Sequence, residues 1–170
     1  GLRQLTNMTL EQLKSISGIG NSKAAILLAT IELSKRINTN VDTIINKSGN
    51  NPQLIYNYYK NILKDKTQEH FYAIYLSARK KIIKDKLLFI GTIDYSLVHP
   101  RDIFKEAYLA NASSIIIVHN HPTGSVIPSS NDIDTTKKLK EIGDLMGIKI
   151  IDHIIIGNNK YYSFYENRDI

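Results

Sequence analysis

The sequence predicts an α/β protein built on one mixed β-sheet with helices on its flanks, preceded by a small all-α segment. Runs of apolar, β-branched residues alternate along the chain with segments whose apolar residues recur at helical spacing. Some consecutive strands are separated by short turns and others by a helix, so hairpins and crossover connections must share one sheet. The sheet is therefore expected to be mixed.

A helical hairpin is expected first. Apolar residues recur at helical spacing over residues 9–14 and 22–36, and between these segments Gly18 and Gly20 flank a single apolar residue. That spacing makes a tight turn, and Asn21 or the serine after it is placed to cap the second helix. The turn would present free backbone N–H groups at a helix N-terminus, which is a usable phosphate site.

A junction follows the hairpin, because turn-forming residues gather between residues 37 and 51. We place a domain boundary there, with a helical segment and linker over residues 1–49 and the α/β domain over residues 50–170. Pro52 suits the first turn of a new helix, whose apolar positions recur as far as Leu63.

The apolar period then changes to two, which predicts a hairpin of strands over residues 69–76 and 82–90. We expect the basic residues in and after its turn to form a solvated tip rather than to meet an acidic partner. They are Arg79, Lys80, Lys81, Lys84 and Lys86.

The remaining elements surround one buried strand. An amphipathic helix over residues 100–111 precedes the apolar run 115–118, which has the length and β-branched content of a buried strand. A helix over residues 129–146 is stopped by Gly147, and strands over 149–156 and 161–165 form a closing hairpin.

Composition restricts the chemistry. A chain of 170 residues with 42% hydrophobic content can bury one core, or one core with a small satellite. No apolar run approaches the roughly 18 residues of a membrane span, and no secretion signal pattern opens the chain, so we expect a cytoplasmic protein without a membrane partner. Because the chain has no cysteine, any metal site must use His, Asp or Glu.

The candidate site directly follows the buried strand. His119 and His121 are two positions apart, so on a strand both side chains point the same way, with Cα atoms about 6.5 Å apart. That separation suits two imidazole nitrogens that share one metal ion. Asp132 follows in the first turn of the next helix, at N3 if Ser129 is the N-cap.

Two interpretations of Asp132 remain open. Ser-x-x-Asp is close to a capping box, and a carboxylate near a helix N-terminus is stabilising without a metal. Beside His119 and His121, the same carboxylate is a candidate third ligand. Three protein ligands leave one position for water, as in catalytic zinc sites. A zinc hydrolase also needs a base, for which Glu69 and Glu106 are the candidates from position alone.

The other histidines have simpler interpretations. His70 and His99 lie at the start of a strand and of a helix, where a surface or capping role is expected. His153, in an apolar strand, is expected to form a hydrogen bond beside the site or to lie in the core. The sequence His-Asn-His does not indicate a nuclease, since nuclease HNH residues are spread over separate elements. Zinc nucleoside deaminases bind their metal through cysteine ligands, and this chain has no cysteine.

These residues carry a resemblance. The spacing His119-x-His121-Pro122, six residues, then Ser129-x-x-Asp132 resembles the signature of the JAMM (MPN-plus) zinc metalloproteases, which adds an upstream Glu. More closely, the whole chain resembles the bacterial RadC proteins. The segments that carry this second resemblance include Ser17-Gly18-Ile19-Gly20, Glu69-His70-Phe71, His99-Pro100-Arg101, His119-Asn120-His121-Pro122 and Asp152-His153.

The resemblance implies a fold and a set of roles. It implies a JAB/MPN architecture related to that of cytidine deaminases. It makes His119, His121 and Asp132 ligands of Zn²⁺, Glu69 the general base, and Ser129 a residue that stabilises the developing oxyanion. The implied reaction is hydrolysis of a peptide or isopeptide bond in a protein or peptide substrate.

The N-terminal hairpin resembles the helix-hairpin-helix motif of DNA-binding proteins, whose Gly-apolar-Gly turn contacts a phosphate without reading sequence. By this resemblance, residues 16–23 would contact DNA through Gly18, Gly20 and Lys23. The alternative is that the two glycines only close a turn that packs on a neighbour. A DNA-associated repair protein is thus the second functional hypothesis.

Overall fold

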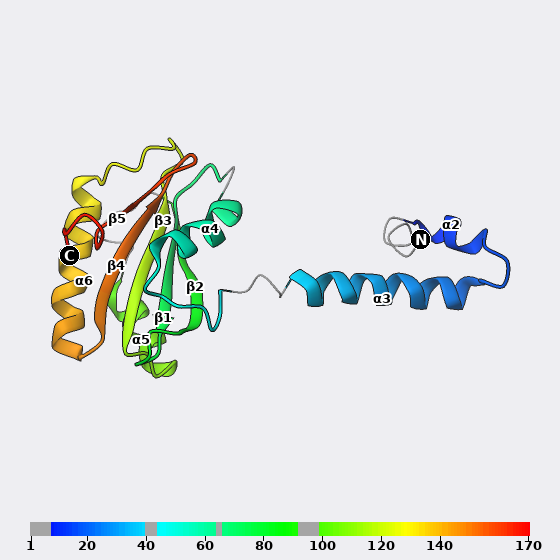
Figure 1. Cartoon of the computed structure of the whole chain (residues 1–170), viewed down its shortest axis with the longest axis horizontal. Coiled ribbons are helices and arrows are strands. Elements are labelled where there is room, and N and C mark those ends of the chain that lie inside the picture. The colour runs from blue at the N-terminus through cyan, green and yellow to red at the C-terminus, as the bar shows by residue number, and fades with distance from the viewer. Residues whose placement is uncertain (1–7, 40–43, 64–65, 92–98) are drawn as a thin grey trace. The chain divides into compact units, whose positions relative to one another are not determined.

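The computed structural model describes residues 8–39, 44–63, 66–91 and 99–170. Contacts divide the chain into two units, Gly1–Thr43 and Ile44–Ile170. Within the described residues, no helix combines the length and apolar character needed to cross a membrane. The elements, labelled in Figure 1, are α2 (Leu10–Lys14), α3 (Asn21–Thr39), α4 (Pro52–Leu63), β1 (His70–Leu76), β2 (Ile82–Ile90), α5 (Pro100–Leu109), β3 (Ser114–Asn120), α6 (Ser130–Met146), β4 (Lys149–Ile156) and β5 (Tyr161–Ser163).

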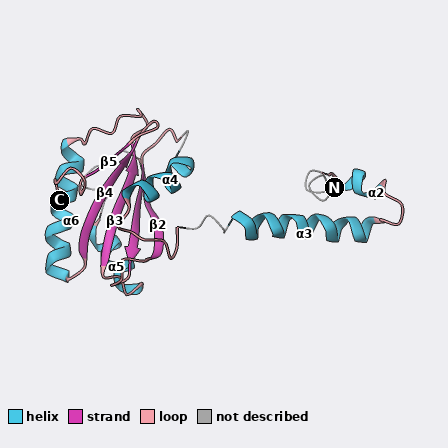
Figure 2. Cartoon of the chain, viewed as in Figure 1, coloured by secondary structure: helices cyan, strands magenta, loops and turns pink. Residues whose placement is uncertain are grey.

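The second unit contains a five-stranded mixed sheet in the order β2-β1-β3-β4-β5 (Figure 2). β3 and β4 are parallel, as the crossover through α6 requires, and the other neighbouring strands are antiparallel. The predicted α/β fold, a mixed sheet flanked by helices, is confirmed. β3 lies at the centre of the sheet, between β1 and β4.

The sheet is covered on both faces, and alternation along β3 divides its residues between two cores. Ile116 packs in one hydrophobic cluster with Tyr59 of α4. Ile117 packs in the other with Phe104 of α5 and Leu139 of α6. Every residue of β3 is buried, which explains its continuous apolar run. The polar residues at its C-terminal end therefore enter a well-packed environment.

Contacts separate the two units between Thr43 and Ile44, and Ile44 is buried in the cluster under α4. The backbone N–H of Asn46 donates to the Ile82 carbonyl at 2.8 Å, and that of Ile82 donates to Lys47 at 3.0 Å. The turn-forming residues after Ile44 are thus bonded to the start of β2.

Two lysines of the basic hairpin do not form a free solvated tip. Lys84 and Lys86 on β2 each contact a carboxylate oxygen of Glu106 on α5 at 2.6 Å. The expectation of a purely solvated cluster is wrong for these two residues. Their partner lies on a helix that packs beside the strand, and hairpin periodicity does not reveal such a contact.

The first unit contains α2 and α3, joined by a turn in which Gly18 has a φ of +84°. A capping box between Thr9 and Gln12 begins α2. The Gly20 carbonyl accepts from the Ala24 N–H at 3.0 Å, and α3 begins directly after Gly20. The expectation that Asn21 or its neighbour caps α3 is therefore wrong, because both already lie within the helix.

Candidate metal centre

Three side chains meet at the C-terminal end of β3. His119 is the penultimate residue of the strand, His121 directly follows it, and Asp132 lies in the first turn of α6. The two Nε2 atoms are 3.0 Å apart. Asp132 Oδ1 is 3.2 Å from Nε2 of His119, and Oδ2 is 3.3 Å from Nε2 of His121. His119 and Asp132 are fully buried, whereas the His121 side chain keeps 12% of its surface exposed.

The spacing of these atoms suits a bound metal. Two donor atoms that each lie about 2.0–2.1 Å from one ion, at the tetrahedral angle, are about 3.3 Å apart. The separations of 3.0, 3.2 and 3.3 Å, of which the last two are measured from different oxygens of Asp132, are close to that value. In the described part of the chain, this is the one group of three or more His, Asp or Glu residues close enough to share an ion. His119, His121 and Asp132 can therefore hold a metal.

The ring of His121 presents the correct nitrogen. Its Nδ1 lies 3.1 Å from the Ser125 carbonyl. A carbonyl only accepts, so Nδ1 carries the proton and Nε2 carries the free lone pair in the neutral ring. His119 has a different partner, because its Nδ1 lies 2.8 Å from Nε2 of His153. The expected hydrogen-bonding role of His153 beside the site is confirmed, and burial lowers the pKa of this histidine well below its usual value.

The electrostatics favour an ionised Asp132. Burial opposes its ionisation, but hydrogen bonds with His119 and His121 hold the pKa of the carboxyl well below its usual range. Asp132 in turn raises the pKa of His121, against the effect of burial, and the Glu69 carboxylate adds to that rise. Asp132 is thus an anion at neutral pH, which is the form that binds a metal.

Asp132 serves the helix and the site together. Ser129 is the N-cap of α6, and the expected capping box is present. The backbone N–H and the hydroxyl of Ser129 both donate to Asp132 Oδ2 at 2.7 Å. The two interpretations that the sequence left open are compatible, since the cap holds the carboxylate in the position from which it faces both imidazoles. The hydroxyl proton of Ser129 points at Asp132 in this arrangement.

Glu69 lies just before β1, next to the histidine pair. β1 and β3 are antiparallel, with Phe71 opposite His119. Continuing this register by two positions sets Glu69 opposite His121 and on the same face. Its backbone is held on both sides, because the Asn120 amide accepts from the His70 N–H at 2.8 Å and donates to the Gln68 carbonyl at 3.2 Å.

Glu106, the other candidate base, lies on α5 and binds two lysines. Hydrogen bonds from Lys84 and Lys86 lower its pKa to about 2. A carboxylate with that pKa is a poor proton acceptor at neutral pH. Of the two glutamates, Glu69 is the one that lies beside His121.

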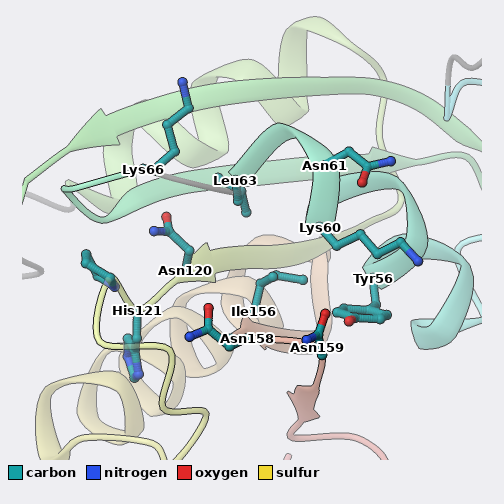
Figure 3. Close-up of a pocket in the computed structure, with 12 residues that line it drawn as sticks. Tyr56, Lys60, Asn61, Leu63, Lys66, Asn120, His121, Ile156, Asn158 and Asn159 are labelled. Atoms are coloured by element: carbon teal, nitrogen blue, oxygen red, sulfur yellow. The ribbon is translucent and has the colours of Figure 1, made fainter.

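A cleft of about 590 Å³ adjoins the metal centre (Figure 3). His121 and Asn120 lie on one wall, α4 forms another, and the turn between β4 and β5 forms the floor. Among the described residues of the lining, Lys60 and Lys66 carry a positive charge. The described residues that line the cleft are Tyr56, Lys60, Asn61, Leu63, Lys66, Asn120, His121, Pro122, Ile156, Gly157, Asn158 and Asn159.

Residues 49–169 match the family model of the RadC-like JAB domain. The chain belongs to the RadC family. Its RadC-like domain includes Glu69 and all three donor residues. The chain is 45% identical over 169 residues to a UPF0758 protein of Geobacillus sp. (strain WCH70), covering 98% of this chain and 73% of that protein. It is 37% identical over 163 residues to a UPF0758 protein of Geobacter sulfurreducens, covering 96% and 71%.

The other sequence-predicted residues lie elsewhere in the RadC-like chain. His99 is the exposed N-cap residue of α5, as expected, although its side chain makes no capping hydrogen bond. His70 is buried, so its expected surface position is wrong, and its Nδ1 lies 3.0 Å from the Gln68 carbonyl. In the first unit, Lys23 Nζ donates to the Gly18 carbonyl at 2.9 Å and so closes the turn.

Sequence reasoning missed two residues at the site. Asn120, between the two histidines, holds the segment that carries Glu69. Thr136 lies 2.6 Å from Nδ1 of His153. The sequence shows only that Thr136 lies one helical turn after Asp132. Its contact with His153 depends on the packing of α6 against β4, which the sequence pattern does not reveal.

Proposed function

We propose that this protein is a zinc-dependent hydrolase that cleaves a peptide or isopeptide bond in a protein or peptide substrate. The observation that carries the proposal is that the two Nε2 atoms of His119 and His121 and the carboxylate of Asp132 lie 3.0–3.3 Å from one another, which suits a tetrahedral site with three protein ligands and one position left for water. Membership of the RadC-like JAB family supports it.

Zinc is the metal that this donor set suits. Two imidazole nitrogens and one carboxylate oxygen form a borderline-soft set that zinc accepts readily, whereas magnesium and calcium prefer oxygen ligands alone. When bound, zinc would act as a Lewis acid that polarises a carbonyl group, and it would lower the pKa of a coordinated water to about 7.

Side chains of the protein transfer the proton of the attacking water. Glu69 accepts the proton of the attacking water and delivers it to the leaving amine. Asn120 limits the movement of Glu69 by bonding the backbone of both its neighbours. Ser129 stabilises the oxyanion only if its hydroxyl turns from Asp132 toward the substrate, so its part in the reaction requires a local rearrangement.

The cleft beside His121 is where we place the substrate chain. It opens directly at the least buried ligand, and its amide side chains offer donors and acceptors to an extended backbone. Among the described residues of its lining, Lys60 and Lys66 carry a positive charge, which favours acidic side chains next to the scissile bond.

The test is hydrolysis of a library of quenched-fluorescence peptides and Lys-linked isopeptides. Chelator-treated protein should be inactive and zinc should restore cleavage. Asp132→Ala should abolish activity, whereas Asp134→Ala, an exposed carboxylate on the same helix, should not. Cleavage that survives both chelation and Asp132→Ala would contradict the proposal.

One observation favours a second function, contact with DNA through residues 16–23. A Cβ built at Gly18 or Gly20 meets no atom within 4 Å, so the turn at the N-terminus of α3 is open to a ligand. Lys23 lies in the same first turn. If the turn binds phosphate, duplex or single-stranded DNA should bind at low salt and dissociate as salt rises, and Lys23→Gln should reduce the salt dependence. No binding at low salt would eliminate this function.

A further inference from the structure

His153 is a buried histidine to which the proposed reaction assigns no role. It lies on β4, opposite Ile117 in the parallel pairing with β3, so it shares the face of the sheet that carries His119. The residue is 1% exposed. Its ring stacks on Phe164 with centroids 5.0 Å apart and meets the edge of Phe71 at 6.1 Å. A charged imidazole is disfavoured in such surroundings, so the ring carries one proton.

Thr136 determines which nitrogen of His153 carries that proton. The Thr136 hydroxyl lies 2.6 Å from the backbone carbonyl of Asp132, one helical turn earlier, and 2.6 Å from Nδ1 of His153. The carbonyl can only accept, so the hydroxyl gives its single proton to Asp132. Nδ1 of His153 must then donate to the hydroxyl oxygen, which leaves Nε2 of His153 as an acceptor.

The tautomer of His153 determines that of His119. Nε2 of His153 lies 2.8 Å from Nδ1 of His119. Because Nε2 accepts, Nδ1 of His119 must donate. The neutral ring of His119 then carries its lone pair on Nε2, the atom that faces Asp132 and His121. If the Thr136 hydroxyl instead donated to Nδ1 of His153, its oxygen would face the Asp132 carbonyl oxygen at 2.6 Å with no proton between them.

We propose that Thr136 and His153 are positioning residues that hold His119 in the tautomer able to bind the metal. The chain of hydrogen bonds begins at the backbone of one ligand, Asp132, and ends on the ring of another, His119. α6 supplies both Asp132 and Thr136, so the helix that delivers the carboxylate also sets the proton on the histidine. This inference rests on the proposed metal site but not on the reaction catalysed there.

Thr136→Val gives the sharpest test, because valine keeps the shape of threonine, removes the hydroxyl, and does not touch His119. Without an acceptor at Nδ1, His153 can move its proton to Nε2 and force a proton onto Nε2 of His119. Loss of such an indirect partner should weaken zinc binding about 10- to 100-fold in competition with a chromogenic chelator. Thr136→Ser keeps the hydroxyl and should bind zinc as the wild type does.

Thr135→Val is the matched control. Thr135 is the adjacent residue of α6, is buried to the same 4% exposure, and lies outside the chain of hydrogen bonds. Equal zinc affinities of Thr136→Val and Thr135→Val would overturn the proposal. Two substitutions of His153 provide a second comparison, because glutamine retains a hydrogen-bond acceptor for Nδ1 of His119 and phenylalanine does not. Zinc affinity should fall with His153→Phe and be largely retained with His153→Gln, and equal losses would also contradict it.

The tautomer can be read without metal or activity. In ¹⁵N-histidine-labelled, metal-free protein at mildly alkaline pH, where free imidazole is neutral, nitrogen shifts should report protons on Nδ1 of both His119 and His153. A wild-type His119 without a proton on Nδ1 would refute the inference, even in a protein that binds zinc. Absence of zinc binding with the Nδ1 tautomer present would instead refute the proposed function.

Discussion

The substitution Glu69→Gln, paired with Glu106→Gln, separates catalysis from stability within one protein. Both changes replace a carboxylate by its neutral isostere. Glu69 lies opposite the metal centre, whereas Glu106 is bound to two lysines on β2. We expect Glu69→Gln to lose hydrolysis and keep its metal, and Glu106→Gln to keep hydrolysis and lose stability.

The two magnitudes follow from the contacts. A general base contributes typically 10²- to 10⁴-fold, so Glu69→Gln should raise the activation barrier by about 2.7–5.5 kcal/mol. Glu106 contacts Lys84 and Lys86, whose side chains are 41% and 43% exposed. Partly exposed ion pairs are screened and contribute about 0.2–1 kcal/mol each, so Glu106→Gln should lower the free energy of unfolding by about 0.4–2 kcal/mol.

The assays are initial rates on a cleaved library peptide, zinc content by elemental analysis, and urea unfolding. The expected pattern is a crossed one, in which each variant changes only one of the two properties. If Glu106→Gln were the inactive variant, or if Glu69→Gln cleaved at the wild-type rate, the assignment of the base from strand register would be refuted.

Three further predictions concern metal and helix cap. Zinc at about 100 times its Kd should stabilise the fold by about 2.7 kcal/mol and raise Tm by roughly 5–11 °C, reversibly with chelator; an unchanged Tm would contradict a folded-state metal site. At one fixed zinc concentration, the gain in stability should be larger at pH 8 than at pH 6. The raised pKa of His121 gives the metal-free protein stability that is present below about pH 6.5 and lost as pH rises through that pKa, while protons compete with zinc at low pH. A pH-independent gain would exclude His121 as a ligand. Ser129→Ala should lower the free energy of unfolding by about 1 kcal/mol in urea through loss of the α6 cap, and an unchanged value would show that the capping box is not stabilising.

The donor set could be predicted from sequence because it is local. His119 and His121 share a face through strand alternation, and Asp132 returns to them through one loop and the first turn of a helix. The central strand could also be predicted, because a strand that is buried on both faces appears in the sequence as a continuous apolar run.

Contacts between distant segments could not be predicted in this way. Position in the sequence left both Glu69 and Glu106 as candidates for the base, and only the resemblance to a family favoured Glu69. The register of β1 against β3 sets Glu69 beside the histidine pair, which sequence position alone did not reveal. The partners of Lys84 and the link from Thr136 to His153 each join elements far apart in the chain. Such pairs depend on packing, which hydrophobic period does not describe.

Elemental analysis of wild-type protein, purified without chelators or added metal, tests whether His119, His121 and Asp132 bind zinc. We expect about one zinc per chain, as for a site with three protein ligands. We also expect His121→Ala and Asp132→Ala to purify with little or no zinc. Metal-free wild-type protein that also fails to take up zinc on dialysis, or full zinc content in both variants, would contradict the account.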